Sequence, residues 1–239
     1  MPPPRAVVCL PTYNERENLE PMLRALADKE VRVLVIDDSS PDGTGDLADR
    51  LAGELDNVEV LHRKRKDGLG PAYLAGFKHA LARDAELILE MDCDFSHDPN
   101  DAPRLIAAVG SGADVALGSR YTQGGGVRNW GFTRRFISAG GSFYARVILG
   151  VNVRDLTGGF KCYRREVLEA IDLDAVTSKG YAFQIETTYR ALRKGFKVVE
   201  VPITFVDRVV GGSKMSRAIV VEAVWKVPLL KLAALSGRV

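Results

Sequence analysis

Short apolar runs alternate with helix-patterned segments along the first half of the chain, and this alternation limits the possible fold more than any other feature. Buried strands are expected at residues 5–10, 31–36, 58–61, 86–91 and 113–117. Helical periodicity marks segments between them, at residues 16–27, 44–55, 72–82 and 99–109. Strands that alternate with helices build βαβ units, so we expect an α/β, Rossmann-like fold with a mostly parallel sheet flanked by helices.

The alternation breaks after residue 120, where glycine-rich and irregular segments enter the chain. We expect, in order, a loop at 121–129, a helix at 132–149, a turn or loop at 155–163, a helix at 182–194, and strands at 197–201 and 203–206. A last helical segment should carry a kink or break at Pro228, because proline has no N–H to donate to the preceding turn.

The composition narrows the class of protein. Lys and Arg number 33 against 31 Asp and Glu, a net charge of +2, so the basic excess typical of nucleic-acid proteins is missing. Cys9, Cys93 and Cys162 lack the spacing of a zinc site or a disulfide framework, and a reducing cytosol is the simplest setting. No run of 18 residues is free of charge, so we expect no transmembrane helix.

Polar residues follow each of the first five expected strands. They lie at residues 11–15, 37–40, 63–70, 92–94 and 118–120. Because the carboxyl ends of parallel strands meet at one edge of a sheet, these clusters predict a ligand site there. The basic run at 63–66, taken alone, is more simply explained as a solvated surface.

The pair Asp92 and Asp94 is the clearest chemical signal. Two carboxylates directly after an apolar strand can hold Mg²⁺ or Mn²⁺, whose ligands are oxygens often shared with phosphates. A plain turn with two exposed aspartates, or a paired-carboxylate hydrolase, would also fit this spacing. A dinucleotide-binding dehydrogenase is excluded, because residues 11–19, where its glycine motif should lie, contain no glycine.

Several motifs together resemble the family 2 glycosyltransferases, which have the GT-A fold, and more narrowly the dolichol-phosphate (polyprenol-phosphate) mannose synthases. The motifs cover most of the chain in order: residues 11–19, 37–44, 67–77, 91–99, 118–121, 129–138, 155–163 and 207–216. The resemblance implies a catalytic domain over residues 1–215, including an acceptor-side helix at about 131–150. Residues 216–239 would form a peripheral C-terminal helical tail.

The resemblance also implies roles for individual residues. Mg²⁺ or Mn²⁺ would be bound by Asp92 and Asp94, with Ser96 at the next metal-side position. Other donor-binding positions would be Pro11, Tyr13, Glu15, Ile36, Asp37, Asp38, Cys93, Arg208 and Lys214. The acceptor phosphate would meet Arg120, Arg134 and Ser138. The residues implied to act in catalysis are Asp94, Arg120, Arg134 and Lys214.

The activity implied is transfer of mannose from GDP-mannose to a polyprenyl or dolichyl monophosphate, with inversion. Two alternatives stay open: the same fold could use UDP-glucose or another UDP-sugar, or the chain could be a non-catalytic membrane-surface module that binds nucleotide. Neither a nucleic acid nor an obligate protein partner is expected.

The helix expected at 132–149 is amphipathic. Arg134, Ser138, Ser142 and Arg146 recur every fourth residue on one face, while aromatic and aliphatic residues gather on the other. Such a helix either packs its apolar face on the core or lies in a membrane interface. The resemblance favours the second reading: a peripheral protein on the cytoplasmic face of a membrane, with the polar face toward the lipid phosphate.

Overall fold

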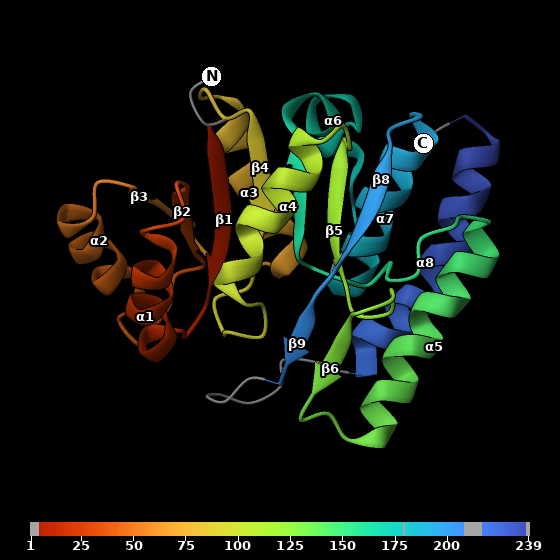
Figure 1. The fold of residues 1–239 in the computed structure, drawn as a ribbon, viewed down its shortest axis with the longest axis horizontal. Helices are drawn as coiled ribbons and strands as arrows, with labels where there is room; N and C mark the ends of the chain where they lie inside the picture. Colours follow the sequence, from red (N-terminus) through yellow and green to blue (C-terminus); the bar gives the residue numbers. More distant parts are fainter. Residues whose placement is uncertain (1–4, 179, 208–216, 238–239) are drawn as a thin grey trace.

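The computed structural model describes residues 5–178, 180–207 and 217–237, and its centre is a seven-stranded sheet (Figure 1). The strand order is β3-β2-β1-β4-β7-β5-β8. The strands are β1 (Ala6–Thr12), β2 (Arg32–Asp37), β3 (Val58–His62), β4 (Leu87–Glu90), β5 (Val115–Ser119), β7 (Lys161–Arg164) and β8 (Val198–Pro202). Neighbouring strands pair in parallel except at β7, which is antiparallel to both β4 and β5. The expected mostly parallel α/β sheet is confirmed.

The expectation of a turn or loop at 155–163 was wrong at its end, where β7 begins. Lys161 starts this strand, and a lysine in a short run suggests a surface position. Its side chain is instead fully buried. The ammonium donates to the Gln184 carbonyl at 3.1 Å and to the Thr187 hydroxyl at 3.2 Å, and lies 3.8 Å from the Glu90 carboxylate. These long-range partners make a buried lysine tolerable, and no local pattern shows them.

Helices cover both faces of the sheet because alternate strand residues face opposite sides. Val8, Val33 and Leu89 face the layer of α1 (Arg16–Leu26), α2 (Thr44–Glu54) and α4 (Ala102–Gly110). Cys9, Leu34 and Ile88 face the layer of α3 (Leu69–Leu81), α6 (Arg165–Ala170) and α7 (Gly180–Arg193). Two short 3₁₀ helices, Pro99–Asp101 and Leu173–Ala175, precede α4 and α7.

Four further elements lie outside the main sheet. Two form a short parallel sheet, β6 (Gly126–Arg128) and β9 (Thr204–Val206), and two are long helices, α5 (Phe132–Leu149) and α8 (Arg217–Leu235), which share a core cluster with α7. The helices α5 and α8 lie side by side at the edge of the molecule (Figure 1). The expected bounds of α5 are confirmed, whereas β6 falls inside the segment expected to be a loop.

Pro228 was expected to kink or break the last helix, and the structure shows no break there. It lies inside α8, which runs continuously through it. Proline cannot donate to the carbonyl four residues earlier, that of Val224. The Tyr144 hydroxyl of α5 donates to this carbonyl at 2.9 Å, so a neighbouring helix supplies the missing hydrogen bond. None of the helices in the described part of the chain is long and apolar enough to cross a membrane.

Candidate active site

The loop after β4 carries the two aspartates of the expected metal site. Asp92 is half-buried, and Asp94 is 6% exposed. The amide of Ser96 donates to Oδ1 of Asp94 at 3.1 Å, which closes a tight turn. Phe95, between them, has φ +57°, a left-handed conformation that is costly for an aromatic residue. The loop therefore holds a strained shape directly beside its carboxylates.

The oxygen atoms of this loop fit a hard divalent cation. Within residues 5–178, 180–207 and 217–237, no three His, Cys, Asp or Glu side chains cluster closely enough to hold a metal ion. The Ser96 hydroxyl is buried, and among the described residues it has no hydrogen-bond partner. Two carboxylates and one hydroxyl suit Mg²⁺ or Mn²⁺, which complete their coordination with water or with substrate phosphates.

Asp92 is held from two sides, by Tyr73 and by His97, and the sequence did not reveal the role of Tyr73. The Tyr73 hydroxyl, on α3, donates to Oδ1 of Asp92 at 3.1 Å. The amide of Asp92 donates to Nδ1 of His97 at 3.3 Å. Burial raises the pKa of Tyr73 well above its usual value, and the charge of Asp92 adds to this, so the phenol keeps its proton. Burial lowers the pKa of His97, so its Nδ1 accepts as a neutral ring.

The aspartates after β2 have separate partners. Asp37 accepts from the Ser40 hydroxyl at 2.6 Å and its amide at 3.2 Å, which shapes the turn. Asp38 forms an ion pair with Arg63, from the end of β3. Burial raises the pKa of Asp38, and the charge of Arg63 opposes that shift. The expectation that the run at 63–66 is merely solvated was therefore wrong for Arg63.

The remaining expected donor residues surround the same strand ends. Lys66 lies 3.7 Å from the centre of the Tyr13 ring, and the Glu15 carboxylate accepts from the Asn18 side chain at 2.9 Å. Ile36 and Cys93 are buried, so their side chains serve packing. Pro11 lies inside β1, opposite Ile36, rather than after the strand. A hollow opens at the ends of β2 and β3. It is lined by Asp37, Ser39, Ser40, Gly43, Gly45, Asp46, His62 and Arg63.

Arg120 is buried beneath the opposite half of the site. Its Nε and Nη2 donate to the two oxygens of Asp155 at 2.8 and 2.6 Å, and its backbone amide adds a third bond at 2.9 Å. Burial alone would lower the pKa of Arg120, but Asp155 outweighs it and the net shift is upward. One edge of the guanidinium is thus already occupied by Asp155, a partner that sequence spacing did not predict.

Arg134 lies near the start of α5, against Trp130. Its guanidinium carbon is 4.5 Å from the Trp130 ring centre, and Nη1 donates to Asp207 at 2.6 Å. Among the described residues, Nε of Arg134 and Nε1 of Trp130 are buried donors without a hydrogen-bond partner. Ser138, one turn later, accepts from the Tyr121 hydroxyl at 2.8 Å. A guanidinium with an unsatisfied N–H of its own, next to the unsatisfied N–H of Trp130, is typical of an anion site.

The loop after β4 with Asp92 and Asp94, here called the metal loop, lies close to Arg134 and Trp130, here called the Arg134 cluster. Strand β9 contacts both. The ring of Phe205 contacts both His97 and Trp130, with centroid distances of 5.3 Å each. The amide of Val206 also donates to the Ser96 carbonyl at 3.2 Å. The structure therefore brings the aspartates and arginines expected from the sequence into one region. The other two expected cations, Arg208 and Lys214, lie outside the described residues.

Tyr181, at the start of α7, belongs to the same region and was missed by the sequence analysis. Burial raises its pKa; the charges of Arg120 and Arg134 lower it and that of Asp92 raises it. The Tyr181 hydroxyl therefore interacts electrostatically with Asp92 and with both arginines. Only its place after a glycine at the beginning of a helix could have drawn attention to it.

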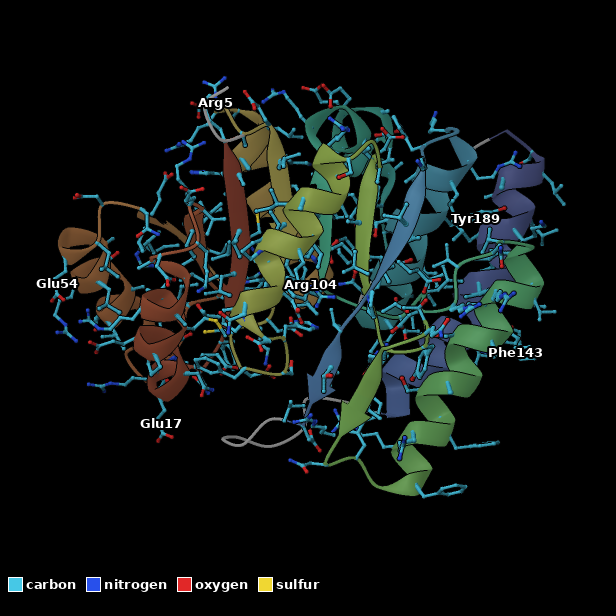
Figure 2. All side chains as sticks on the ribbon, viewed as in Figure 1. Arg5, Glu17, Glu54, Arg104, Phe143 and Tyr189 are labelled. Carbon is cyan, nitrogen blue, oxygen red and sulfur yellow. The ribbon has the colours of Figure 1, made fainter. Side chains whose placement is uncertain are left out.

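The helix α5 presents an apolar face outward. Its exposed large side chains are Phe132, Phe136, Ile137, Phe143 and Val147. Figure 2 shows Phe143 on the outer side of α5, away from the sheet. The opposite face points inward, with Ser142 buried against the Thr157 hydroxyl at 3.0 Å. The polar face therefore meets the site, and the core covers little of the apolar stripe.

Comparison with known proteins identifies relatives over nearly the whole chain. The sequence model described as Glycosyl transferase family 2 matches residues 7–172. A polyprenol monophosphomannose synthase of Mycolicibacterium smegmatis is 54% identical over 95% of this chain and 86% of its own length. An undecaprenyl-phosphate mannosyltransferase of Micrococcus luteus is 52% identical over 96% of this chain and 95% of its own length.

Solved structures share the fold at much lower sequence identity. A mannosyltransferase from Pyrobaculum calidifontis in complex with GDP-Man and Mn²⁺ aligns with a TM-score of 0.58 at 15% identity, covering 98% of this chain and 74% of that one. A glucosyl-3-phosphoglycerate synthase from Mycobacterium tuberculosis, in complex with Mn²⁺ and UDP, aligns with a TM-score of 0.61 at 18% identity, covering 98% and 80%. These two matches concern the fold alone.

Proposed function

Because this chain belongs to glycosyl transferase family 2 and has the GT-A fold, we propose that it transfers mannose from GDP-mannose to a polyprenyl monophosphate. The products are polyprenyl-phosphate β-mannose and GDP. Two relatives more than half identical to it, a polyprenol monophosphomannose synthase and an undecaprenyl-phosphate mannosyltransferase, support both the sugar and the acceptor class.

The observation that carries the proposal is the pair of unsatisfied donors on Arg134 and Trp130. Nε of Arg134 and Nε1 of Trp130 are buried without a partner in the described part of the chain, which costs free energy unless a ligand accepts from them. A phosphate oxygen is a strong acceptor and carries the charge that Arg134 attracts. We assign the acceptor phosphate to this cluster, with Ser138 and Arg120 at its border.

The chemistry follows from the charge of the acceptor. The second pKa of a phosphate monoester is about 6, so the acceptor is mostly dianionic at neutral pH and needs little help from a general base. Its oxygen displaces GDP directly at the anomeric carbon, and the configuration inverts. Arg134 lowers the repulsion between the two phosphorylated substrates. Asp92, Asp94 and Ser96 would hold Mg²⁺ or Mn²⁺, which stabilises charge on the leaving diphosphate when bound.

The donor nucleotide belongs, in this proposal, at the ends of β1, β2 and β3. Arg63, which forms an ion pair with Asp38, supplies a guanidinium at the hollow beside Asp37. The Lys66 ammonium lies over the Tyr13 ring, 3.7 Å from its centre. Arg208 and Lys214, which precede α8 in the chain, keep their proposed role in closing over the diphosphate.

The exposed face of α5 meets the bilayer that carries the acceptor. Phe136 is 72% exposed and Phe143 is 65% exposed, whereas Ser142 of the same helix is buried. Aromatic side chains on one face of a helix and cationic groups on the other favour the membrane interface. We place this surface on the cytoplasmic side of the membrane, in keeping with three cysteines that are all free.

A test of the acceptor site is the substitution Trp130→Phe. It keeps an aromatic ring against Arg134 and removes one unsatisfied N–H. We expect KM for polyprenyl phosphate to rise about 10- to 150-fold, since a hydrogen bond to a charged group contributes about 1.5–3 kcal/mol, while Kd for GDP-mannose stays unchanged. The control is Trp225→Phe, because Trp225 is exposed on α8. An unchanged KM in Trp130→Phe would contradict the assignment.

A further inference from the structure

The motif at residues 67–77 has no role in the function described so far, yet it sets one side of the metal loop. This motif forms most of α3, and its residues Gly70, Tyr73 and Gly76 recur every third position. Residues three apart lie on neighbouring faces of a helix, so these three share one side. That side packs against the sheet and the start of α7.

The two glycines allow α3 to approach closely. A Cβ atom at Gly76 would lie 2.4 Å from the Ile36 side chain, and one at Gly70 would lie 2.7 Å from the Ser178 carbonyl. Neither contact is possible for a larger residue without displacing its neighbour. The helix can therefore sit deep enough for the Tyr73 hydroxyl to reach the loop after β4.

Tyr73 is fixed in place by its surroundings. Its side chain is fully buried, and its ring stacks on Phe183 and Phe77, with centroid distances of 5.9 Å each. A buried ring packed against two other rings has little freedom to move, so its hydroxyl is a fixed donor. Asp92 lies in the loop after the end of β4, within reach of this hydroxyl.

We infer that Tyr73 is a positioning residue for the proposed metal site, orienting the Asp92 carboxylate through the 3.1 Å hydrogen bond to Oδ1. This rests on the proposed function, since Asp92 matters here as a metal ligand. A hydroxyl that donates to one carboxylate oxygen fixes the rotation of the group and aims the other oxygen. Partners of this kind typically change metal affinity about 10–100-fold when they are removed.

The test is Mn²⁺ binding to Tyr73→Phe in the presence of GDP, followed by electron paramagnetic resonance of the free ion. The substitution keeps the stacked ring and removes only the hydroxyl. We expect Kd for Mn²⁺ to rise about tenfold. We also expect kcat at saturating Mn²⁺ to change much less than the Mn²⁺ concentration needed for half-maximal activity.

Tyr144→Phe is the matched control, because it also removes a phenolic hydrogen bond but lies between α5 and α8. We expect it to lower the Tm of the protein and to leave Kd for Mn²⁺ unchanged. If Tyr73→Phe behaved like this control, the positioning role would be overturned and the hydroxyl would be purely structural. If the wild-type protein bound no Mn²⁺ with GDP, the metal site and the positioning role would both fail.

Discussion

The buried pair of Arg120 and Asp155 offers a demanding test of how the acceptor side is built. The perturbation is Asp155→Asn, which keeps the size of the side chain and removes its charge. Arg120 and Asp155 have side chains only 4% and 0% exposed, so water cannot solvate the arginine that remains. Removing one partner of a buried ion pair costs about 3–5 kcal/mol.

This cost translates into a large change in Tm. One kcal/mol lowers Tm by about 2–4 °C in a domain of about 150–250 residues, so the expected fall is about 6–20 °C. Thermal unfolding followed by circular dichroism measures it. The control is Asp84→Asn, because Asp84 pairs with Arg5 and Arg32 at the surface, where water screens the charges. The Tm of this variant should stay close to that of the wild type.

A double substitution separates the ion pair from the site it supports. Arg120→Met with Asp155→Leu replaces two buried charges by apolar side chains, which is often neutral or stabilising. We expect this variant to recover part of the lost Tm, because the Arg120 amide still lacks its acceptor, and to have no transferase activity. A fall in Tm no larger for Asp155→Asn than for Asp84→Asn would refute the reasoning that Arg120 is a buried charge dependent on Asp155.

Three further predictions concern the metal loop, the membrane face and the last helix. Asp94→Asn should reduce mannosyl transfer by more than about 100-fold, because it alters a proposed direct metal ligand rather than a supporting group. Its circular dichroism spectrum should stay unchanged, and substantial activity would rule out the metal assignment. Phe136→Ser and Phe143→Ser should each weaken binding to anionic liposomes, measured by flotation, about 10- to 150-fold, from the loss of about 1.5–3 kcal/mol of apolar burial. The control Leu69→Ser should float as the wild type does. Tyr144→Phe should lower the free energy of unfolding in urea by about 1 kcal/mol by leaving the Val224 carbonyl unsatisfied. That loss should shrink in a Pro228→Ala background, where the new N–H can take the carbonyl; equal losses in both backgrounds would show that Pro228 is irrelevant.

The features that the sequence predicted well are those with a local signal. Apolar runs and helical periodicity predicted the five parallel strands β1 to β5 and the bounds of α5. The topological rule for parallel sheets then placed Asp38 and Asp92 at the same edge. The polar ladder of α5 also correctly separated the inward Ser142 from the outward Phe143.

The features that the sequence missed depend on partners far away in the chain. The β7 strand is held between β4 and β5, and its Lys161 is stabilised by residues of α7. Arg63 looks like a surface residue until its partner Asp38 is known. Tyr73 gives no sign of its hydrogen bond to Asp92, because only the packing of α3 brings the two groups together.

The central claim is the transfer of mannose to a lipid phosphate, and the most direct measurement is the fate of a labelled sugar. The wild-type protein would be incubated with polyprenyl phosphate, Mg²⁺ or Mn²⁺, and radiolabelled GDP-mannose or UDP-glucose, and the lipid would then be extracted. We predict that label enters the lipid fraction from GDP-mannose and requires the divalent ion. Label that enters the lipid only from UDP-glucose would contradict the assignment of GDP-mannose as the donor. No transfer from either sugar nucleotide would contradict the assignment of a glycosyltransferase activity.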